Sequence, residues 1–114
     1  MLRSRLLFIC TANINRSRTA EDLFKNSDAY EVRSAGFIRH SLGGQVVTQA
    51  LINWADKIFV MDEVRDQHLS ILRRKFVVDH KRIYVLDVPD IYSRDNVRLI
   101  ELLKSRLADL NIFI

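Results

Sequence analysis

The sequence contains a single cysteine, Cys10, among its 114 residues. One thiol excludes an internal disulfide framework and any zinc site built from several thiolates. A free thiol is typical of a reducing compartment, so we expect the protein in the cytoplasm. Cys10 is therefore either a small apolar residue of the core or a reactive group.

Proline, glycine and long apolar runs are also scarce. One proline and three glycines leave little room for linkers, and the sequence has no repeat or low-complexity segment. No stretch approaches transmembrane length, and the apolar run 6–9 is too short for the core of a secretion signal. With 48% hydrophobic and 28% charged residues, we expect one globular domain, residues 1–114, without membrane association.

The balance of charge is basic, with a formal net charge of +4. Such a balance helps to attract anionic substrates. The basic residues are spread along the chain and form neither a basic tail nor a patch interleaved with aromatics, so nucleic acid is not expected as a partner.

The histidines give no sign of a metal site. His40, His68 and His80 lack the spacing of metal ligands, and we expect them to be ordinary surface residues. The sequence thus predicts no cofactor. Asp62, at the end of an expected strand, is expected to cap the helix that follows.

Apolar periodicity alternates between that of strands and that of helices. Strands are expected at 6–9, 30–36, 57–61 and 82–86, and helices at 17–25, 47–54, 65–76 and 95–110. This order predicts an α/β fold: a single-domain, open four-stranded parallel sheet with helices on both faces. Ligands of such sheets bind outside the carboxyl ends of the strands, where Cys10, Ser34, Asp62 and residues 87–90 fall. We therefore expect one shared site there.

Cys10 ends the first strand, and Arg16 follows after five intervening residues, just before a helix. A loop of this length can wrap one tetrahedral oxyanion with inward backbone N–H groups, while the helix N-terminus adds positive charge. The guanidinium can bind two phosphate oxygens, and both positive groups favour the thiolate. The sequence predicts a phosphate-binding loop with a nucleophile at its floor. The intervening residues are Thr11, Ala12, Asn13, Ile14 and Asn15.

Further segments match one known pattern in order along nearly the whole chain. They are the strand and loop 7–17, the helix start 19–24, the turn 34–36, the stretch 54–62 and an acidic loop before the last helix. In these segments the chain resembles the low-molecular-weight protein tyrosine phosphatases, most closely a short bacterial branch of that family. The resemblance implies a phosphomonoesterase that acts through a phosphocysteine on a phosphorylated protein or a small phosphomonoester.

The resemblance also assigns roles by position. Cys10 matches the nucleophile and Arg16 the residue that binds the phosphoryl group. Asn13 and Ser34 match residues that hold the loop in its strained shape, and Ser17 matches a residue that hydrogen-bonds the thiolate.

The general acid of the family lies in an Asp-Pro-Tyr type of segment. The match here is Asp90-Ile91-Tyr92, in which the proline is absent and Pro89 precedes instead. The resemblance therefore implies Asp90 as the acid, with Asp87 as the competing candidate.

The chain departs from the family pattern in other places as well. Asn15 stands where the family usually has a second cysteine, so a protective disulfide with Cys10 is excluded. The segment after Gly36 is shorter than usual, and in longer relatives that region supplies an aromatic wall for the phosphotyrosine ring. Phe37 and Tyr92 are the apparent substitutes.

Two other functions remain open at the level of sequence. One is an arsenate reductase-like enzyme on the same fold, although an intramolecular cysteine relay needs further cysteines, which this chain lacks. The other is a phosphate- or phosphopeptide-binding module with little turnover, which the shortened segment and the altered acid loop would suit.

Overall fold

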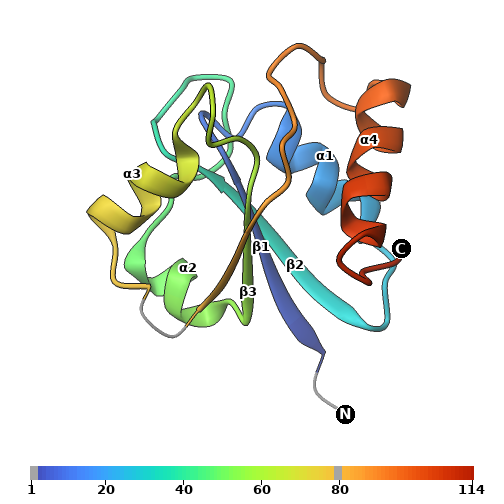
Figure 1. The fold of residues 1–114 in the computed structure, drawn as a ribbon, viewed down its shortest axis with the longest axis horizontal. Helices are drawn as coiled ribbons and strands as arrows, with labels where there is room; N and C mark the ends of the chain where they lie inside the picture. The colour runs from blue at the N-terminus through green and yellow to red at the C-terminus, as the bar shows by residue number, and fades with distance from the viewer. Residues whose placement is uncertain (1–2, 79–80) are drawn as a thin grey trace.

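The structure, a computed structural model, describes residues 3–78 and 81–114, so His80 lies outside the described residues. Its elements are β1 (Ser4–Cys10), α1 (Arg16–Leu23), β2 (Tyr30–Gly36), α2 (Gln49–Trp54), β3 (Lys57–Val60), α3 (His68–Lys75), β4 (Arg82–Val85) and α4 (Val97–Ala108). The strands form one parallel sheet in the order β2-β1-β3-β4. Helices α1 and α4 cover one face, and α2 and α3 cover the other (Figure 1). This confirms the predicted α/β architecture.

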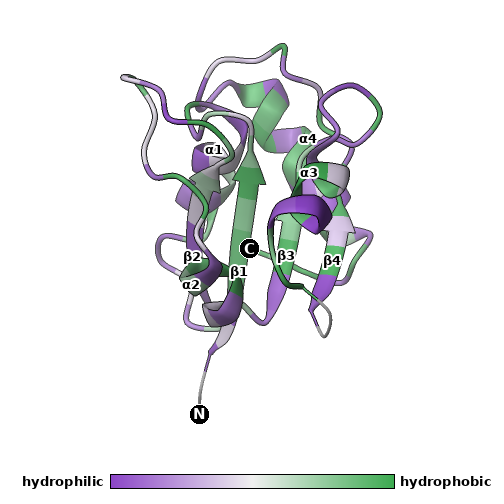
Figure 2. Cartoon of the chain, turned by 90° about the vertical axis from the view of Figure 1, so that its left-hand side faces the viewer, coloured by the Kyte–Doolittle hydropathy of each residue, from purple (hydrophilic) through white to green (hydrophobic). Residues whose placement is uncertain are grey.

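Strand β1 is buried on both faces, which explains its continuous apolar run. Leu6 and Phe8 point with Cys10 into the core beneath α1 and α4. Leu7 and Ile9 point into the core beneath α2 and α3. Figure 2 shows this apolar strand between β2 and β3. The alternation places Cys10 on the α1 and α4 face at the end of the most deeply buried strand.

Helix α3 begins at His68, three residues later than the periodicity predicts. The carboxylate of Asp62 accepts the backbone N–H groups of Arg65 and Asp66, which closes a turn ahead of the helix. The expectation that Asp62 caps the helix itself is therefore wrong, because the residue preceding α3 is Gln67 in a left-handed conformation. The later start leaves residues 61–67 as a loop at the end of β3.

Because all the strands are parallel, their four carboxyl ends lie at one end of the sheet. The chain leaves β1 through α1 to reach β2 on one side, whereas β3 pairs with β1 on the other side. The end of β1 is thus the point where the strand order reverses, and such points bind ligands in open α/β sheets. Among the described residues, no helix combines the length and the apolar character needed to span a membrane.

Candidate functional site

Residues 11–15 form a loop between β1 and α1, and part of its backbone is hydrogen-bonded from outside. Three carbonyls of this region accept hydrogen bonds of 2.9–3.2 Å from the segment after β2, in the pairs Phe37 to Cys10, Ile38 to Thr11 and Gly44 to Asn13. With its carbonyl groups satisfied from outside, the loop can direct amide groups inward toward an anion.

The loop encloses a pocket of about 90 Å³. Typical small-molecule sites measure about 300–1,000 Å³, so this pocket suits one small group and leaves the rest of a larger ligand outside. Every residue that lines it was predicted from the sequence. They are Cys10, Thr11, Ala12, Ile14, Asn15, Arg16 and Asp90.

Three predicted residues, Asn13, Ser17 and Ser34, do not line the pocket but support the loop. Asn13 has a left-handed backbone with φ of 53°, a conformation that asparagine tolerates better than most residues. Its Nδ2 donates to Ser17 Oγ at 2.7 Å and to Ser34 Oγ at 3.0 Å, and its Oδ1 accepts the amide of Gln45 at 3.0 Å. Ser34 in turn donates to Glu21. This buried network holds the loop in its shape.

The thiol of Cys10 is contacted by the first turn of α1. Ser17 Oγ lies 3.0 Å from Cys10 Sγ. Ser17 Oγ accepts a hydrogen bond from Asn13 Nδ2, so its own hydroxyl proton can point to Cys10 Sγ at 3.0 Å or to the carbonyl of Ala35 at 3.4 Å, and the sulfur is the nearer of the two. A hydroxyl donor and the positive end of a helix both stabilise a thiolate.

Arg16 is fully buried and held by the protein on one edge. Its Nη1 donates to Asp66 Oδ2 at 2.8 Å and to the carbonyl of Val88 at 2.9 Å, and its Nε lies 3.8 Å from Asp90 Oδ1. Asp66 was not predicted from the sequence. Charge-assisted contacts of this kind fix the plane of a guanidinium, which leaves its other edge for a ligand.

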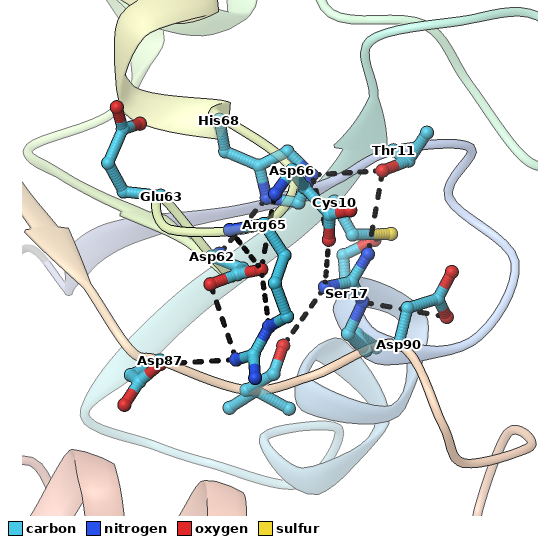
Figure 3. A network of polar contacts seen from close by, with 12 residues as sticks. Cys10, Thr11, Ser17, Asp62, Glu63, Arg65, Asp66, His68, Asp87 and Asp90 are labelled. Carbon is cyan, nitrogen blue, oxygen red and sulfur yellow. Dashed lines mark hydrogen bonds and ion pairs between the residues drawn. The ribbon is translucent and has the colours of Figure 1, made fainter.

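The two candidate acids lie in different surroundings. Asp90 lines the pocket beside Arg16. The carboxylate of Asp87 instead faces Arg65 at 3.3 Å (Figure 3). It also lies 3.9 Å from Arg106. Only Asp90 of the two is next to the thiol pocket.

His68 is buried and contacts the loop, so the prediction of a surface histidine is wrong. Its Nε2 lies 3.0 Å from Thr11 Oγ1, and its Nδ1 accepts the backbone N–H of Asp62 at 3.1 Å (Figure 3). Burial, reinforced by the positive charge of Arg16, lowers the pKa of His68 to about 4. The sequence does hold a signal for this burial, because His68 precedes the core residue Leu72 by one helical turn.

Asn15 connects the loop to the segment that carries Asp90. Its Oδ1 accepts the backbone N–H of Arg94 at 3.0 Å. A second tie follows, since the N–H of Asp95 donates to Thr19 Oγ1 at 3.0 Å. The segment between β4 and α4 is thus fastened to α1, a connection that sequence reasoning missed.

The two aromatic residues expected to replace the missing wall lie outside the pocket itself. Phe37 packs near His68, with ring centroids 5.5 Å apart. Tyr92 is partly buried against the core beneath α1 and α4. They flank the site without lining its floor.

A larger hollow of about 410 Å³ lies along α1, and its lining includes Arg18, Asp22 and Arg94. Arg94 and Asp22 form an ion pair there, so this hollow is a solvated surface groove of mixed charge that does not contain Cys10. Within residues 3–78 and 81–114, no cluster of three potential ligands could hold a metal ion. The smaller pocket, where thiol, cation and acid meet, is therefore the candidate site.

Comparisons with known proteins concern the family and the fold of the chain. The profile of the family described as low molecular weight phosphotyrosine protein phosphatase matches residues 5–52. No curated protein sequence matches the chain.

Solved structures share the fold over nearly the whole chain. A low molecular weight phosphotyrosine phosphatase from Vibrio cholerae O395 is 24% identical, with a TM-score of 0.76 over 95% of this chain and 94% of its own. An arginine phosphatase from Geobacillus stearothermophilus is 21% identical, with a TM-score of 0.65 over 95% and 92%. A thioredoxin-dependent arsenate reductase from Corynebacterium glutamicum is 20% identical, with a TM-score of 0.63 over 95% and 60%. The chain is thus similar to the low molecular weight phosphotyrosine protein phosphatase family over residues 5–52, and it shares the fold of the Vibrio cholerae phosphatase over nearly its whole length.

Proposed function

We propose that the protein is a phosphomonoesterase, most specifically a protein tyrosine phosphatase, that acts through a phosphocysteine on Cys10. The observation that carries the proposal is the arrangement of three groups around one pocket of about 90 Å³: the thiol of Cys10, the guanidinium of Arg16 and the carboxyl group of Asp90. Phosphoryl transfer needs a nucleophile, stabilisation of negative charge and a proton for the leaving group, and these three residues supply them.

In the first step the thiolate of Cys10 attacks phosphorus, and the bond from phosphorus to the leaving oxygen breaks. The carboxyl group of Asp90 gives its proton to that oxygen. Arg16 and the amide groups of residues 11–15 bind the non-bridging oxygens of the phosphoryl group. The products of this step are the dephosphorylated alcohol or phenol and the phosphocysteine.

In the second step water attacks the phosphocysteine. The carboxylate of Asp90 takes a proton from the water, the bond from sulfur to phosphorus breaks, and inorganic phosphate is released. Ser17 donates a hydrogen bond to the departing thiolate, at the 3.0 Å separation already present between the two atoms. Asn13 and Ser34 act from behind by holding the loop in place.

The size of the pocket limits which part of a substrate can enter it. Because it suits little more than the phosphoryl group, the leaving group lies outside, between the segments that carry Phe37 and Tyr92. A phosphorylated protein or a small aryl phosphate satisfies this geometry. We place the activity in a single domain, residues 1–114, working in the cytoplasm, where the free thiol stays reduced.

Hydrolysis of p-nitrophenyl phosphate by the wild type and by Cys10→Ser, with vanadate as competitor, tests the proposal. We expect turnover only in the wild type, competitive inhibition by vanadate, and a transient mass increase of one phosphoryl group on Cys10 after rapid quenching. Cys10→Ser serves as the matched control because it keeps the size of the side chain and should still bind phosphate.

Two alternative outcomes would replace the proposal. The fold is shared with an arsenate reductase, so arsenate reduction with an external thiol is measured in parallel. Arsenate reduction without phosphate ester hydrolysis would assign the chain to that chemistry. Phosphate binding without either turnover would make it a binding module.

A further inference from the structure

We propose that His68 is a positioning residue for the phosphoryl site: it fixes the hydroxyl group of Thr11 so that this hydroxyl donates a hydrogen bond to a non-bridging phosphoryl oxygen. Thr11 then contributes a side-chain donor in addition to its backbone amide. The inference rests on the proposed function for the identity of the ligand, but phosphate binding alone is enough to test it.

The protonation pattern of His68 follows from its partner on one side. The backbone amide of Asp62 can only donate, and it lies 3.1 Å from His68 Nδ1. Nδ1 must therefore be the nitrogen without a proton, so a neutral ring carries its proton on Nε2. Burial supports the neutral ring, because it lowers the pKa of His68 to about 4.

The hydroxyl oxygen of Thr11 accepts a hydrogen bond from His68 Nε2–H. His68 Nε2 lies 3.0 Å from Thr11 Oγ1, and Arg16 Nη2 lies 3.5 Å from the same oxygen. A hydroxyl has two acceptor lone pairs and one proton to donate. Because His68 and Arg16 both donate to the oxygen, the hydroxyl proton of Thr11 is left to donate a hydrogen bond to another group.

Thr11 lies where a bound phosphoryl oxygen would accept a hydrogen bond from its hydroxyl group. Thr11 lines the pocket together with Cys10 and Arg16. Arg16 Nη1 is occupied by Asp66 and Val88, so the edge of the guanidinium toward Nη2 is the one left for a ligand. A phosphoryl oxygen bound at Nη2 lies next to Thr11 Oγ1, because these two atoms are themselves 3.5 Å apart.

His68 is well placed to impose this orientation, because separate elements hold it. The ring of Phe37, after β2, lies 5.5 Å from the imidazole. On the other side, the buried carboxylate of Asp62 accepts the backbone N–H and the Nε–H of Arg65, which fixes the turn that supplies the Asp62 amide. Burial acts to raise the pKa of Asp62, but the hydrogen bonds and positive charge of Arg65 outweigh burial and lower this pKa. The Asp62 carboxylate in the turn therefore stays ionised.

The test is a double-mutant cycle on the affinity for inorganic phosphate and vanadate, with Thr11→Val, His68→Gln and the double variant. We expect Thr11→Val to weaken phosphate binding about tenfold or more, as for the loss of one hydrogen bond to a charged group. His68→Gln should weaken it less, and it should add nothing once Thr11 is valine. His40→Gln, an exposed histidine of the same chain, is the matched control and should leave affinity unchanged.

A second readout keeps the inference testable if a variant fails to fold. Nitrogen-15 shifts of the wild-type imidazole should show the Nε2–H tautomer of His68 at neutral pH. Equal effects of His68→Gln in the wild-type and Thr11→Val backgrounds would reduce His68 to a structural residue, and an Nδ1–H tautomer would overturn the inference directly. A wild type that binds phosphate without hydrolysing esters would refute the proposed enzyme while leaving this cycle measurable.

Discussion

Asn15 Oδ1 accepts a hydrogen bond of 3.0 Å from the backbone N–H of Arg94, a residue 79 positions later in the chain. Asn15 belongs to the proposed phosphate-binding loop, and Arg94 belongs to the segment that carries Asp90. The position that usually holds a second cysteine in the related family thus holds a residue that fastens the proposed acid segment to the loop. The contact couples the placement of the acid to the placement of the nucleophile.

Asn15→Ala should therefore impair protonation of the leaving group more than binding of phosphate. Losing one hydrogen bond corresponds to about a three- to tenfold decrease in kcat for phenyl phosphate. Nitrophenyl phosphate should be affected less, because its leaving group needs little protonation. The two rates are measured side by side.

Arg94→Ala is the control for this prediction. It keeps the backbone N–H and removes only the exposed ion pair with Asp22, and such pairs contribute about 0–1 kcal/mol. Equal slowing of both substrates by Asn15→Ala, or an equal effect of Arg94→Ala, would contradict the coupling.

Arg16→Lys should be nearly as damaging as removal of the side chain, with kcat/KM reduced by about 10²-fold or more. A lysine keeps the charge but cannot reproduce the planar fork, and it would leave Asp66 without its 2.8 Å partner. Asp66→Asn should raise KM, because the guanidinium loses the group that fixes its plane. Arg65→Lys is the control, since Arg65 faces Asp62 and Asp87 and not the pocket. Near-normal activity of Arg16→Lys would mean that Arg16 does not bind the phosphoryl group.

All three glycines of the sequence abut the same two residues of the loop. A Cβ on Gly36 would lie 2.6 Å from the backbone of Ala12 and of Asn13, one on Gly43 would lie 2.3 Å from the carbonyl oxygen of Ala12, and one on Gly44 would lie 2.2 Å from Asn13 Oδ1. These distances are too short for any side chain, so the close approach of the segment after β2 to the loop requires glycine.

Gly43→Ala should consequently displace the backbone of Ala12 and weaken phosphate binding. The strain should also lower the free energy of unfolding by about 1–3 kcal/mol. Ser41→Ala, an exposed position in the same segment, is the matched control for calorimetric titration with phosphate and for urea unfolding. Unchanged phosphate affinity in Gly43→Ala would show that the loop does not depend on this contact.

Local patterns predicted much of this molecule. The alternation of strand and helix periodicity predicted the sheet, which the structure confirms, and the spacing of Cys10 and Arg16 predicted a loop whose two ends line one pocket. Both features depend on residues close in sequence. The glycines were recognisable only as breaks in the pattern, since their need to approach Ala12 and Asn13 depends on the folded chain.

The missed residues depend on contacts between distant segments. Asp66 and His68 reach the loop only because Asp62 closes a turn and delays the start of α3, which apolar periodicity cannot reveal. The contact between Asn15 and Arg94 likewise joins two loops with no shared local signal. Loops at the ends of parallel strands meet through topology, so their pairwise contacts follow only from the folded arrangement.

Stability should fall on mild acidification because of His68. Its pKa in the folded protein is lowered to about 4, whereas an unfolded histidine has a pKa of about 6.5. The unfolded chain therefore binds a proton first, and the stabilising contribution of the neutral ring is present above about pH 6.5 and is lost as the pH falls toward 4.

Urea unfolding of the wild type and of His68→Gln at pH 7 and pH 4.5 measures this effect. The wild type should lose more free energy of unfolding between the two pH values than the variant. His40→Gln is the control, since it removes an exposed histidine, keeps His68 and should retain the larger pH dependence. Equal losses in the wild type and His68→Gln would show that His68 does not resist protonation in the folded protein.

The last prediction separates Asp90 from Asp87 as the proposed general acid. Asp90 lines the thiol pocket, whereas Asp87 faces Arg65 and Arg106. Asp90→Asn should slow substrates with poor leaving groups by about 10²–10⁴-fold and nitrophenyl phosphates much less. Phosphate affinity should not fall, because the substitution removes a negative charge 3.8 Å from Arg16 Nε.

Asp87→Asn is the matched variant, with the same chemical change three residues upstream. Because Asp87 is exposed and its ion pairs lie at the surface, the substitution should change stability by less than about 1 kcal/mol and leave the dependence on leaving group intact. A plot of log kcat against the leaving-group pKa for both variants decides the matter. A steeper slope in Asp87→Asn with a wild-type slope in Asp90→Asn would move the acid to Asp87, and wild-type slopes in both would require a proton donor other than these two carboxyl groups.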